Sequence, residues 1–398
     1  MDHAHHRVLV VGGGNGGISV AARLRRRGVD DIALIEPRDF HFYQPLFSHV
    51  AGGTARASET VRPMAGVIPP GVQWIQDAVV AVDPDRRTVT LAGGDVVGYE
   101  HLVLSPGIRQ DWDAVPGLLA ALGTPAVTSH YRHELAVKTS ALLRDLREGT
   151  VVFVQPPGEA SCWGASQKPM YQACAYWRAR GVLGRIRVIL VVPTPTVFGL
   201  PHIDRELDRK IAEYGIEVRT ESELIEVDGE AREAVVAGPG GAERIAFDVL
   251  NVVPPQSAPT WIAASPLSDG ADAGGFVAVD PETLRHRTHP DVWALGDVAG
   301  AGNSKSGGAL RTQTLVVAEN LAAVLAGRAP TARYDGYGVC PFTVSRNTVV
   351  WAEFDRDGRP APTIPFWKDM YRESRISWVF DRHILPWVYW NLILRGLV

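Results

Sequence analysis

A glycine-rich loop near the N-terminus limits the fold more than any other feature of this chain. An apolar run, Arg7 to Val11, leads directly into Gly12-Gly13-Gly14-Asn15-Gly16-Gly17, and Ile18 to Arg27 continue as a helical stretch. In this spacing the first glycine allows a tight turn, the second lets a pyrophosphate approach the backbone, and the third lets helix pack on strand. A second strand, Asp31 to Ile35, ends in Glu36, which is placed to accept hydrogen bonds from ribose hydroxyls. The pattern predicts a βαβ unit that binds a dinucleotide at the helix N-terminus.

Two later segments favour FAD over NAD as this dinucleotide. Residues 99–105 read as a strand that runs into Ser105-Pro106-Gly107, where flavoproteins of this class return the chain across the dinucleotide. Far downstream, residues 292–297 end in Gly296-Asp297, before a helical stretch from Gly308 to Leu325. Asp297 is expected to bind the ribityl chain, although a capping role is the alternative, and the helix is expected to point its N-terminus at the flavin ring. The predicted FAD-binding residues are Gly12, Gly14, Asn15, Gly17, Glu36, Gln44, Val79, Ser105, Gly107, Asp297, Lys305, Ser306, Gly307 and Gly308.

The length of 398 residues allows two or three domains. We predict an α/β fold with two Rossmann-like dinucleotide-binding domains of the disulfide-reductase-like kind, followed by a C-terminal membrane-associating region. The FAD-binding domain is expected to be split between residues 1–112 and 275–330. The second Rossmann-like domain is expected at 113–274, and the C-terminal region, with Cys340, the quinone site and the membrane interface, at 331–398. The net charge of −4 gives no reason to expect nucleic acid as a partner.

The second βαβ unit, which begins with a strand at 150–155 and continues into a helix at 167–180, lacks a glycine loop. The connecting segment reads Pro156-Pro157-Gly158-Glu159-Ala160-Ser161-Cys162. Proline has no N–H to donate to a pyrophosphate, and its ring blocks close approach. NAD(P)H therefore has no evident binding site. Because Cys162 takes the place of this loop and Cys340 follows 178 positions later, we expect electrons to enter the flavin from sulfur.

In these features the chain resembles the sulfide:quinone oxidoreductases, in particular the branch of the mitochondrial enzymes and some bacterial relatives. The resemblance rests on Val11-Gly12-Gly13-Gly14-Asn15-Gly16-Gly17, Glu36-Pro37, His41-Phe42-Tyr43-Gln44-Pro45, Ser161-Cys162, Gln167-Lys168-Pro169-Met170-Tyr171, Gly296-Asp297, Ser304-Lys305, Tyr334-Asp335-Gly336-Tyr337, Cys340-Pro341, Ala352-Glu353-Phe354-Asp355 and Tyr389-Trp390-Asn391. A further cysteine that some bacterial members have near the N-terminal third of the chain is absent here, so the mechanism is expected to need only two. The chain stops at Leu397-Val398, without the tail of some relatives, which leaves the strength of membrane attachment open.

The resemblance implies an FAD enzyme that oxidises hydrogen sulfide to a persulfide and passes electrons to a membrane quinone. It implies that Cys162 and Cys340 form a disulfide, or a sulfur-bridged form of one, at the isoalloxazine ring. Cys340 is expected to carry the new persulfide and Cys162 to pass the electron pair to the flavin. The alternative is two buried free thiols. Lys168 and Lys305 are candidates for lowering thiol pKa or steadying reduced flavin, or else are ordinary exposed charges, and Cys174 is expected to pack inside its helix.

The C-terminal region combines aromatic and apolar residues. Five of the chain's 11 tryptophans lie there: Trp351, Trp367, Trp378, Trp387 and Trp390. Residues 384–394 are almost wholly apolar but fall short of the ~20 residues that a spanning helix needs. We predict a segment in the bilayer interface, from which a quinone reaches the flavin. A hydrophobic dimer interface or a hairpin that covers the core remains the alternative.

The expected partners are sulfide, ubiquinone or menaquinone, a sulfur acceptor such as sulfite or glutathione, and a membrane surface. No metal is expected, and His3, His5 and His6 read as a frayed terminus. With no signal peptide and no transmembrane span, we expect a peripheral protein on the cytoplasmic face of a bacterial plasma membrane. The quinone, the final sulfur acceptor, the oligomeric state and any covalent FAD link stay open.

Two rival functions remain. A type II NADH:quinone dehydrogenase would need the glycine loop that Pro156 and Pro157 displace. A non-enzymatic flavin redox sensor would leave the two cysteines and the aromatic terminus without a role.

Overall fold

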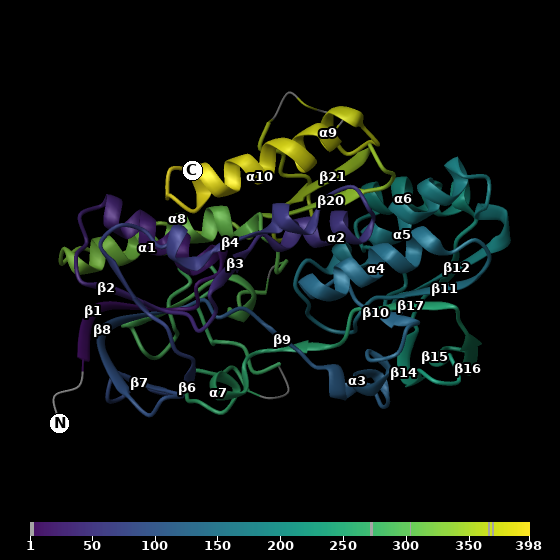
Figure 1. The fold of residues 1–398 in the computed structure, drawn as a ribbon. Helices are drawn as coiled ribbons and strands as arrows, with labels where there is room; N and C mark the ends of the chain where they lie inside the picture. The colour runs from purple at the N-terminus through teal and green to yellow at the C-terminus, as the bar shows by residue number, and fades with distance from the viewer. Residues whose placement is uncertain (1–3, 271–273, 303, 365–366, 368–369) are drawn as a thin grey trace.

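Two sheets and a C-terminal helical segment organise the chain in the computed structural model (Figure 1). It describes residues 4–270, 274–302, 304–364, 367 and 370–398. The first sheet has the strand order β5-β2-β1-β8-β7-β6, with β19 beside β8. Its parallel strands are β1 (Ala4–Val11), β2 (Ile32–Ile35), β5 (Val72–Ile75), β8 (Val96–Leu104) and β19 (Val292–Ala294), and its antiparallel edge is the hairpin of β6 (Val79–Asp83) and β7 (Thr88–Leu91). Because β19 comes from far downstream, the first sheet is completed only after a long insertion.

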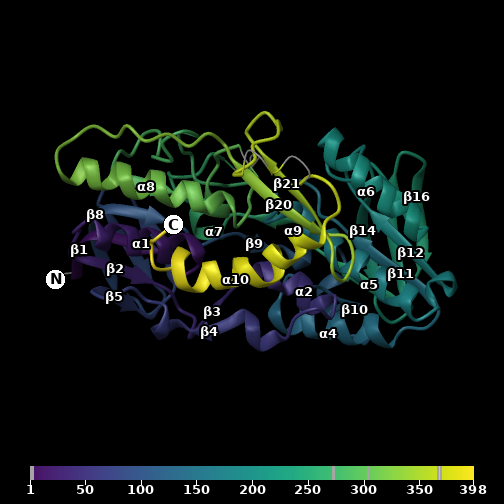
Figure 2. The same cartoon turned by 90° about the horizontal axis from the view of Figure 1, so that it is seen from above.

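The first sheet is buried, and two helices cover one of its faces. Val8, Leu9 and Val10 of β1 are fully buried, as expected for a parallel strand that is covered on both faces. Helices α1 (Asn15–Arg26) and α8 (Ala309–Leu325) pack side by side against it (Figures 1 and 2). Smaller elements of this part are β3 (Phe40–Phe42), β4 (Val61–Pro63), α2 (Phe47–Ala51) and α7 (Thr260–Ala263).

The insertion builds a second parallel sheet in the order β10-β17-β11-β12-β13. Its elements are β10 (Val127–Thr128), α4 (His133–Asp145), β11 (Gly149–Val154), α5 (Lys168–Ala179), β12 (Ile186–Val191), α6 (Pro201–Tyr214), β13 (Glu217–Arg219) and β17 (Val249–Val252). A three-stranded antiparallel sheet, β14 (Glu223–Asp228), β15 (Glu233–Gly238) and β16 (Gly241–Ala246), lies beside it with α3 (Leu118–Ala121). Where the chain enters and leaves the insertion, β9 (Arg109–Gln110) pairs with β18 (Gln256–Ser257). The fold is α/β with two Rossmann-like sheets, as predicted, whereas the domain boundaries themselves stay a prediction.

The C-terminal part consists of a hairpin and a helical rod. The hairpin is β20 (Gly338–Thr343) with β21 (Val349–Phe354). The rod runs without a break through α9 (Arg375–Val379), a π-helical turn (Phe380–Ile384), α10 (Leu385–Val388) and a second π-helical turn (Tyr389–Ile393). Pro386 cannot donate the usual backbone hydrogen bond, and the wider turn before it accommodates its ring. Seen from above, the rod extends from the hairpin toward α1 (Figure 2).

One expectation about local structure is wrong. His5 and His6 do not belong to a frayed terminus, because both lie in β1 and the His6 Nδ1 atom is 2.7 Å from Asp31 Oδ1. His3 lies outside the described residues. Over those residues no helix is both long and apolar enough to cross a membrane.

Candidate functional site

The glycine loop lies between the end of β1 and the start of α1. Gly12 has a φ of +104°, and a Cβ atom built on it would lie 2.3 Å from the carbonyl oxygen of Ser105. A Cβ atom on Gly17 would lie 1.9 Å from the carbonyl oxygen of Gly12. The close packing of strand, loop and helix therefore demands glycine at both positions. Gly14 is different, because nothing in the chain lies within 4 Å of a Cβ atom there.

The N-terminus of α1 is available to an anion. Gly14 precedes it without a side-chain cap, and the first turn has no acidic residue. The Asn15 side chain instead contacts the segment before α8, with its Nδ2 atom 3.4 Å from the carbonyl oxygen of Gly307. Uncapped N–H groups at a helix N-terminus, together with the helix dipole, favour a phosphate. The open space at Gly14 and this helix end fit the pyrophosphate of FAD.

The carboxyl ends of the parallel strands bring the next candidates to this loop. Glu36 follows β2 and accepts the Gly13 N–H at 2.8 Å through its Oε2 atom. Ser105 follows β8 and donates its N–H to Val11 at 2.8 Å. Burial alone would raise the pKa of Glu36, but hydrogen bonds from Arg38 and Gly13 together lower it, so the carboxylate is ionised at neutral pH. Buried at this position, Glu36 is suited to bind ribose hydroxyls.

The remaining FAD candidates lie in three places. Gly107 has a φ of +80° and open space around it. Gln44, which is exposed, precedes Pro45, whose Cγ atom would lie 3.7 Å from a Cβ atom on Gly307. Val79 begins β6, four positions beyond Ile75, and the Ile75 carbonyl oxygen accepts the Glu36 N–H. Their roles at a bound cofactor stay predictions.

Lys305 ties the two sheets together. Its ammonium donates to the carbonyl oxygens of Asp297 (2.8 Å) and Ala299 (3.1 Å) and lies 2.9 Å from Glu159 Oε2. Glu159 belongs to the insertion, whereas Asp297 follows β19. The alternative of an ordinary exposed charge is wrong for Lys305 and for Lys168, since each is 6% exposed.

Asp297 lies in a short 3₁₀ turn directly after β19. Burial raises the pKa of its carboxyl group, while a hydrogen bond with Ser161 and the nearby Lys305 ammonium act in the opposite direction. The contact with Ser161 places Asp297 next to the residue that precedes Cys162. The predicted ribityl-binding carboxylate and the predicted redox cysteine therefore lie at the same place in the fold.

Cys162 has an unusual backbone conformation that is held from several sides. Its φ of +43° and ψ of +56° are left-handed, which few residues other than glycine adopt. The Cys162 N–H donates to the carbonyl oxygen of Lys305 (2.6 Å), and its own carbonyl oxygen accepts from the Ala165 N–H (2.6 Å) and the Tyr131 hydroxyl (3.1 Å). The Gly307 N–H donates to its sulfur. The surrounding contacts therefore fix the Cys162 sulfur beside the start of α8.

Cys340 lies close to the loop that carries Cys162. It belongs to β20 and is 4% exposed. A Cβ atom on Gly164, two residues after Cys162, would lie 2.8 Å from the Cys340 Sγ atom, and the Gly164 N–H donates to this sulfur. None of the three cysteines forms a disulfide in the structure, so the predicted disulfide stays a prediction. Cys174 is fully buried in α5, where it packs as expected.

Burial and charge act in opposite directions on the two thiols. Burial raises the pKa of Cys340 to about 12 and raises the pKa of Cys162 as well. The buried ammonium of Lys168, at the start of α5, lowers both values. The positive charge of Lys168 therefore stabilises the thiolate form of either cysteine and offsets part of the effect of burial.

Side chains fill the place where a nicotinamide loop would lie. Gln155 follows β11 and is fully buried, and its Oε1 atom accepts from Ser166 Oγ (2.9 Å) and Gln167 Nε2 (3.0 Å). The Tyr171 hydroxyl donates to Gln167 Oε1 at 2.9 Å. The 3₁₀ helix η5 (Trp163–Gln167) therefore lies at the carboxyl end of β11, where a dinucleotide-binding loop would lie. Helix α5 begins only after η5.

His41, the first residue of the His41-Phe42-Tyr43-Gln44-Pro45 motif, has a role that the sequence does not predict. This side chain is 1% exposed, and its Nδ1 atom lies 2.8 Å from the carbonyl oxygen of Gly13 while Nε2 lies 2.6 Å from the Tyr389 hydroxyl. Burial lowers the pKa of His41 to about 4, so the ring is neutral at pH 7. Because a carbonyl oxygen only accepts, Nδ1 carries the proton and Nε2 accepts from Tyr389. The helical rod thus reaches the glycine loop through one hydrogen bond.

Two residues that follow β10 were missed as supports of the cysteine loop. The Tyr131 hydroxyl donates to the carbonyl oxygen of Ser161 at 2.9 Å, in addition to that of Cys162. The ring of His130 donates from Nε2 to the carbonyl oxygen of Ala165 at 3.0 Å, and burial lowers its pKa to about 4. Both follow the carboxyl end of a parallel strand, the edge where such sheets gather their sites. That position was the available signal, but a two-residue strand is too short to recognise from sequence.

Comparisons with known proteins find relatives that are named sulfide:quinone oxidoreductases. The model of the pyridine nucleotide-disulphide oxidoreductase family matches residues 6–322. The mitochondrial sulfide:quinone oxidoreductase of Mus musculus is 36% identical over 98% of this chain and 87% of its own length. The mitochondrial enzyme of the same name from Dictyostelium discoideum is 32% identical over 98% of this chain and 86% of its own length. Among solved structures, the sulfide:quinone oxidoreductase of Aquifex aeolicus superposes with a TM-score of 0.83 at 19% identity, over 99% of this chain and 92% of that one, which shows a shared fold.

Proposed function

Because the chain belongs to the sulfide:quinone oxidoreductases, within the pyridine nucleotide-disulphide oxidoreductase family, we propose that it oxidises hydrogen sulfide and delivers the electrons to a quinone. One observation carries this proposal beyond family membership. The sulfur of Cys340 packs against Gly164, two residues from Cys162, at the end of β11 where a nicotinamide would otherwise bind. Sulfide, the proposed reductant, would therefore react with a cysteine sulfur where other enzymes of this fold bind a nicotinamide.

The proposed cofactor is one FAD per chain. When bound, it accepts an electron pair from sulfur and gives that pair to the quinone. The Gly12–Gly17 loop and the start of α1 would hold its pyrophosphate, Glu36 its ribose and Asp297 its ribityl chain. Gly107, Gln44 and Val79 would line the dinucleotide, and residues 305–308 would lie at the flavin ring.

The cysteines would act through disulfide exchange. Hydrosulfide attacks the Cys340 sulfur of a Cys162–Cys340 disulfide, the S–S bond breaks, a persulfide forms on Cys340 and Cys162 leaves as a thiolate. The Lys168 ammonium and the Gly307 N–H both lower the pKa of Cys162, so they stabilise this leaving group. An acceptor such as sulfite or glutathione would then remove the outer sulfur of the persulfide, and Cys340 would be a thiolate again. The Cys162 and Cys340 thiolates would re-form their disulfide by giving two electrons to the bound flavin, which would pass them to the quinone.

Anaerobic mixing tests this function directly. Sulfide is expected to bleach the flavin of the purified protein, and a short-chain ubiquinone is expected to restore the colour. NADH at the same concentration is expected to leave the flavin oxidised, because the side chains of Gln155 and Gln167 fill the loop region after β11. Bleaching by NADH instead of sulfide would favour a type II NADH:quinone dehydrogenase.

We also propose that the helical rod lies on a membrane, which would be the cytoplasmic face of the plasma membrane in a bacterium. Its outer side exposes Ile376 (70%), Val379 (45%), Ile384 (41%) and Trp387 (58%), at a spacing that sets them on one side of a helix. Its inner side packs Tyr389 against Tyr43, with ring centroids 4.3 Å apart. An apolar face of this kind could hold the protein where ubiquinone or menaquinone dissolves.

Acidic residues on the outer side should prevent membrane binding. The variant with both Ile376→Glu and Trp387→Glu is expected to stay in the supernatant when lipid vesicles are sedimented, whereas the unchanged protein pellets with them. Ile225→Glu, at a 43% exposed isoleucine of β14, is the matched control and is expected to bind vesicles normally. Equal sedimentation of all three proteins would reject the membrane role. Substitution is preferable to deletion, because deletion would also remove Tyr389 from His41.

A further inference from the structure

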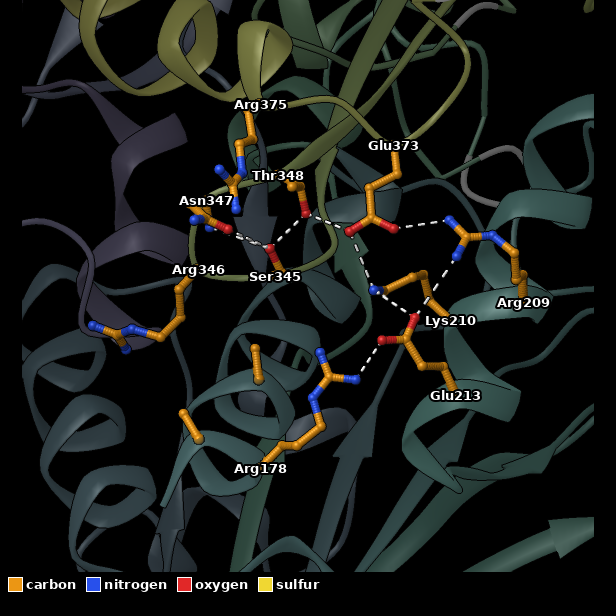
Figure 3. A pocket seen from close by; sticks show the side chains of 12 residues that line it. Arg178, Arg209, Lys210, Glu213, Ser345, Arg346, Asn347, Thr348, Glu373 and Arg375 are labelled. Atoms are coloured by element: carbon orange, nitrogen blue, oxygen red, sulfur yellow. Dashed lines mark hydrogen bonds and ion pairs between the residues drawn. The ribbon is translucent and has the colours of Figure 1, made fainter. Parts of the chain in front are cut away.

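A cavity of about 610 Å³ opens between α5, α6, the turn that joins β20 to β21, and the start of α9 (Figure 3). It lies outside the site described above. Five cationic side chains line it, from residues 178, 209, 210, 346 and 375, and only two carboxylates, Glu213 and Glu373. Its formal charge is therefore +3, in a protein whose net charge is −4.

The two carboxylates are already bound to cations of the cavity. Glu213 pairs with Arg178 and lies 2.8 Å from the Lys210 ammonium. Glu373 accepts from Arg209 at 2.8 Å and lies 3.2 Å from Lys210. Lys210 is 2% exposed and lies between both, so these ion pairs form a fixed floor (Figure 3). The floor therefore has a formal charge of +1, and the other two positive charges of the cavity lie elsewhere.

Two arginines supply these two charges at the other wall. Arg346 donates to the carbonyl oxygens of Gly52 (3.0 Å) and Gly53 (2.9 Å), which hold the guanidinium in place without neutralising it. Arg375 is exposed and extends from the start of α9 toward the turn (Figure 3). Within the described part of the chain, neither arginine forms an ion pair with a carboxylate. Asn347, on the turn between them, adds an amide nitrogen that can donate hydrogen bonds, whereas the Ser345 hydroxyl is already bound to Asn347 Oδ1 and Thr348 Oγ1.

We propose that this cavity binds a phosphate-bearing anion. A guanidinium matches two phosphate oxygens with two N–H groups, and two arginines without acidic partners can hold a dianion from two directions. The volume is in the range of small-molecule sites. This proposed phosphate binding is independent of the proposed oxidation of sulfide. The phosphate could belong to a soluble anion or to a lipid headgroup, because Arg375 is adjacent in sequence to Ile376 on the proposed membrane face.

Inorganic phosphate tests the soluble source. In dilute phosphate-free buffer, calorimetric titration of the FAD-loaded protein with inorganic phosphate is expected to show saturable binding to one site. Arg375→Gln is expected to weaken this binding about tenfold, because it removes a charge-assisted pair of hydrogen bonds. Arg395→Gln is the matched control, since it removes the same charge from an exposed position beyond the other end of the rod and is expected to bind as the unchanged protein does. Equal melting temperatures without phosphate would show that each variant is folded.

Vesicles test the lipid source. Sedimentation is compared on phosphatidylcholine vesicles with and without phosphatidylglycerol. If the phosphate belongs to a lipid headgroup, phosphatidylglycerol is expected to strengthen vesicle binding of the unchanged protein and of Arg395→Gln. It is expected to strengthen vesicle binding of Arg375→Gln much less. A defect of Arg375→Gln in either experiment supports the site and identifies its source. The proposal is overturned if Arg375→Gln and Arg395→Gln behave alike in both, because any effect would then be unspecific charge attraction.

Discussion

Cys340→Ser is expected to abolish sulfide-dependent quinone reduction, a loss of about a thousandfold or more, while FAD stays bound. A serine oxygen cannot form the disulfide that hydrosulfide attacks, so no persulfide can be made at this position. The change is nearly isosteric and occurs in a strand, so the glycine loop should be undisturbed. Cys162→Ser should have the same effect, since the exchange then has no thiolate to release.

Cys174→Ser provides the control for these two variants. Cys174 is also buried, in α5, but it has no place in the proposed exchange. This variant is expected to lose some stability, because a hydroxyl is buried in an apolar core, yet to retain its turnover. The measurement is the rate of quinone reduction by sulfide, with flavin absorbance recorded for each variant. Near-normal turnover of Cys340→Ser or Cys162→Ser would contradict the redox pair.

Gly17→Ala is expected to prevent stable folding of the FAD-binding sheet. The added methyl group would lie 1.9 Å from the carbonyl oxygen of Gly12, which is a backbone atom, and a Cβ atom cannot rotate away from it. Overpacking of this kind costs about 3 kcal/mol or more where the neighbours cannot move. The variant should therefore be insoluble, or melt at much lower temperature, and contain no flavin.

Gly14→Ala separates folding from cofactor binding. Its methyl group meets no atom of the chain within 4 Å, so the apoprotein should melt within a few degrees of the unchanged apoprotein. If the pyrophosphate lies against this residue, FAD affinity should nevertheless fall about tenfold or more. Fluorescence titration of both apoproteins with FAD measures this difference. Unchanged FAD affinity in Gly14→Ala would exclude this loop as the pyrophosphate site.

The glycine loop could be predicted because neighbours in sequence determine its structure. Strand, turn and helix follow one another without a gap, and the spacing of Gly12, Gly14 and Gly17 has a separate physical reason at each position. The boundaries were less certain: α1 begins at Asn15 rather than Ile18, and β8 begins at Val96 rather than Tyr99. Such ends depend on hydrogen bonds that the sequence pattern does not contain.

Long-range contacts could not be predicted in the same way. The approach of Cys340 to Gly164 depends on where the β20–β21 hairpin docks, and the hydrogen bond from Tyr389 to His41 joins residues 348 positions apart. The burial of Lys168 and Lys305 was equally hidden, because a lysine is usually exposed unless the fold provides partners for its ammonium. The cavity beside α9 combines residues from four separate segments, and no one segment indicates it.

The ion pair and hydrogen bonds of Lys305 have a mechanical consequence. One ammonium joins Glu159 of the insertion to the carbonyl oxygens that follow β19, and the backbone of the same lysine accepts the Cys162 N–H. The two sheets are thereby joined directly beside Cys162, one of the two proposed redox cysteines. We therefore expect the proposed reaction to need no hinge motion between the two sheets, because this link holds Cys162 beside the segment that is proposed to contact the flavin.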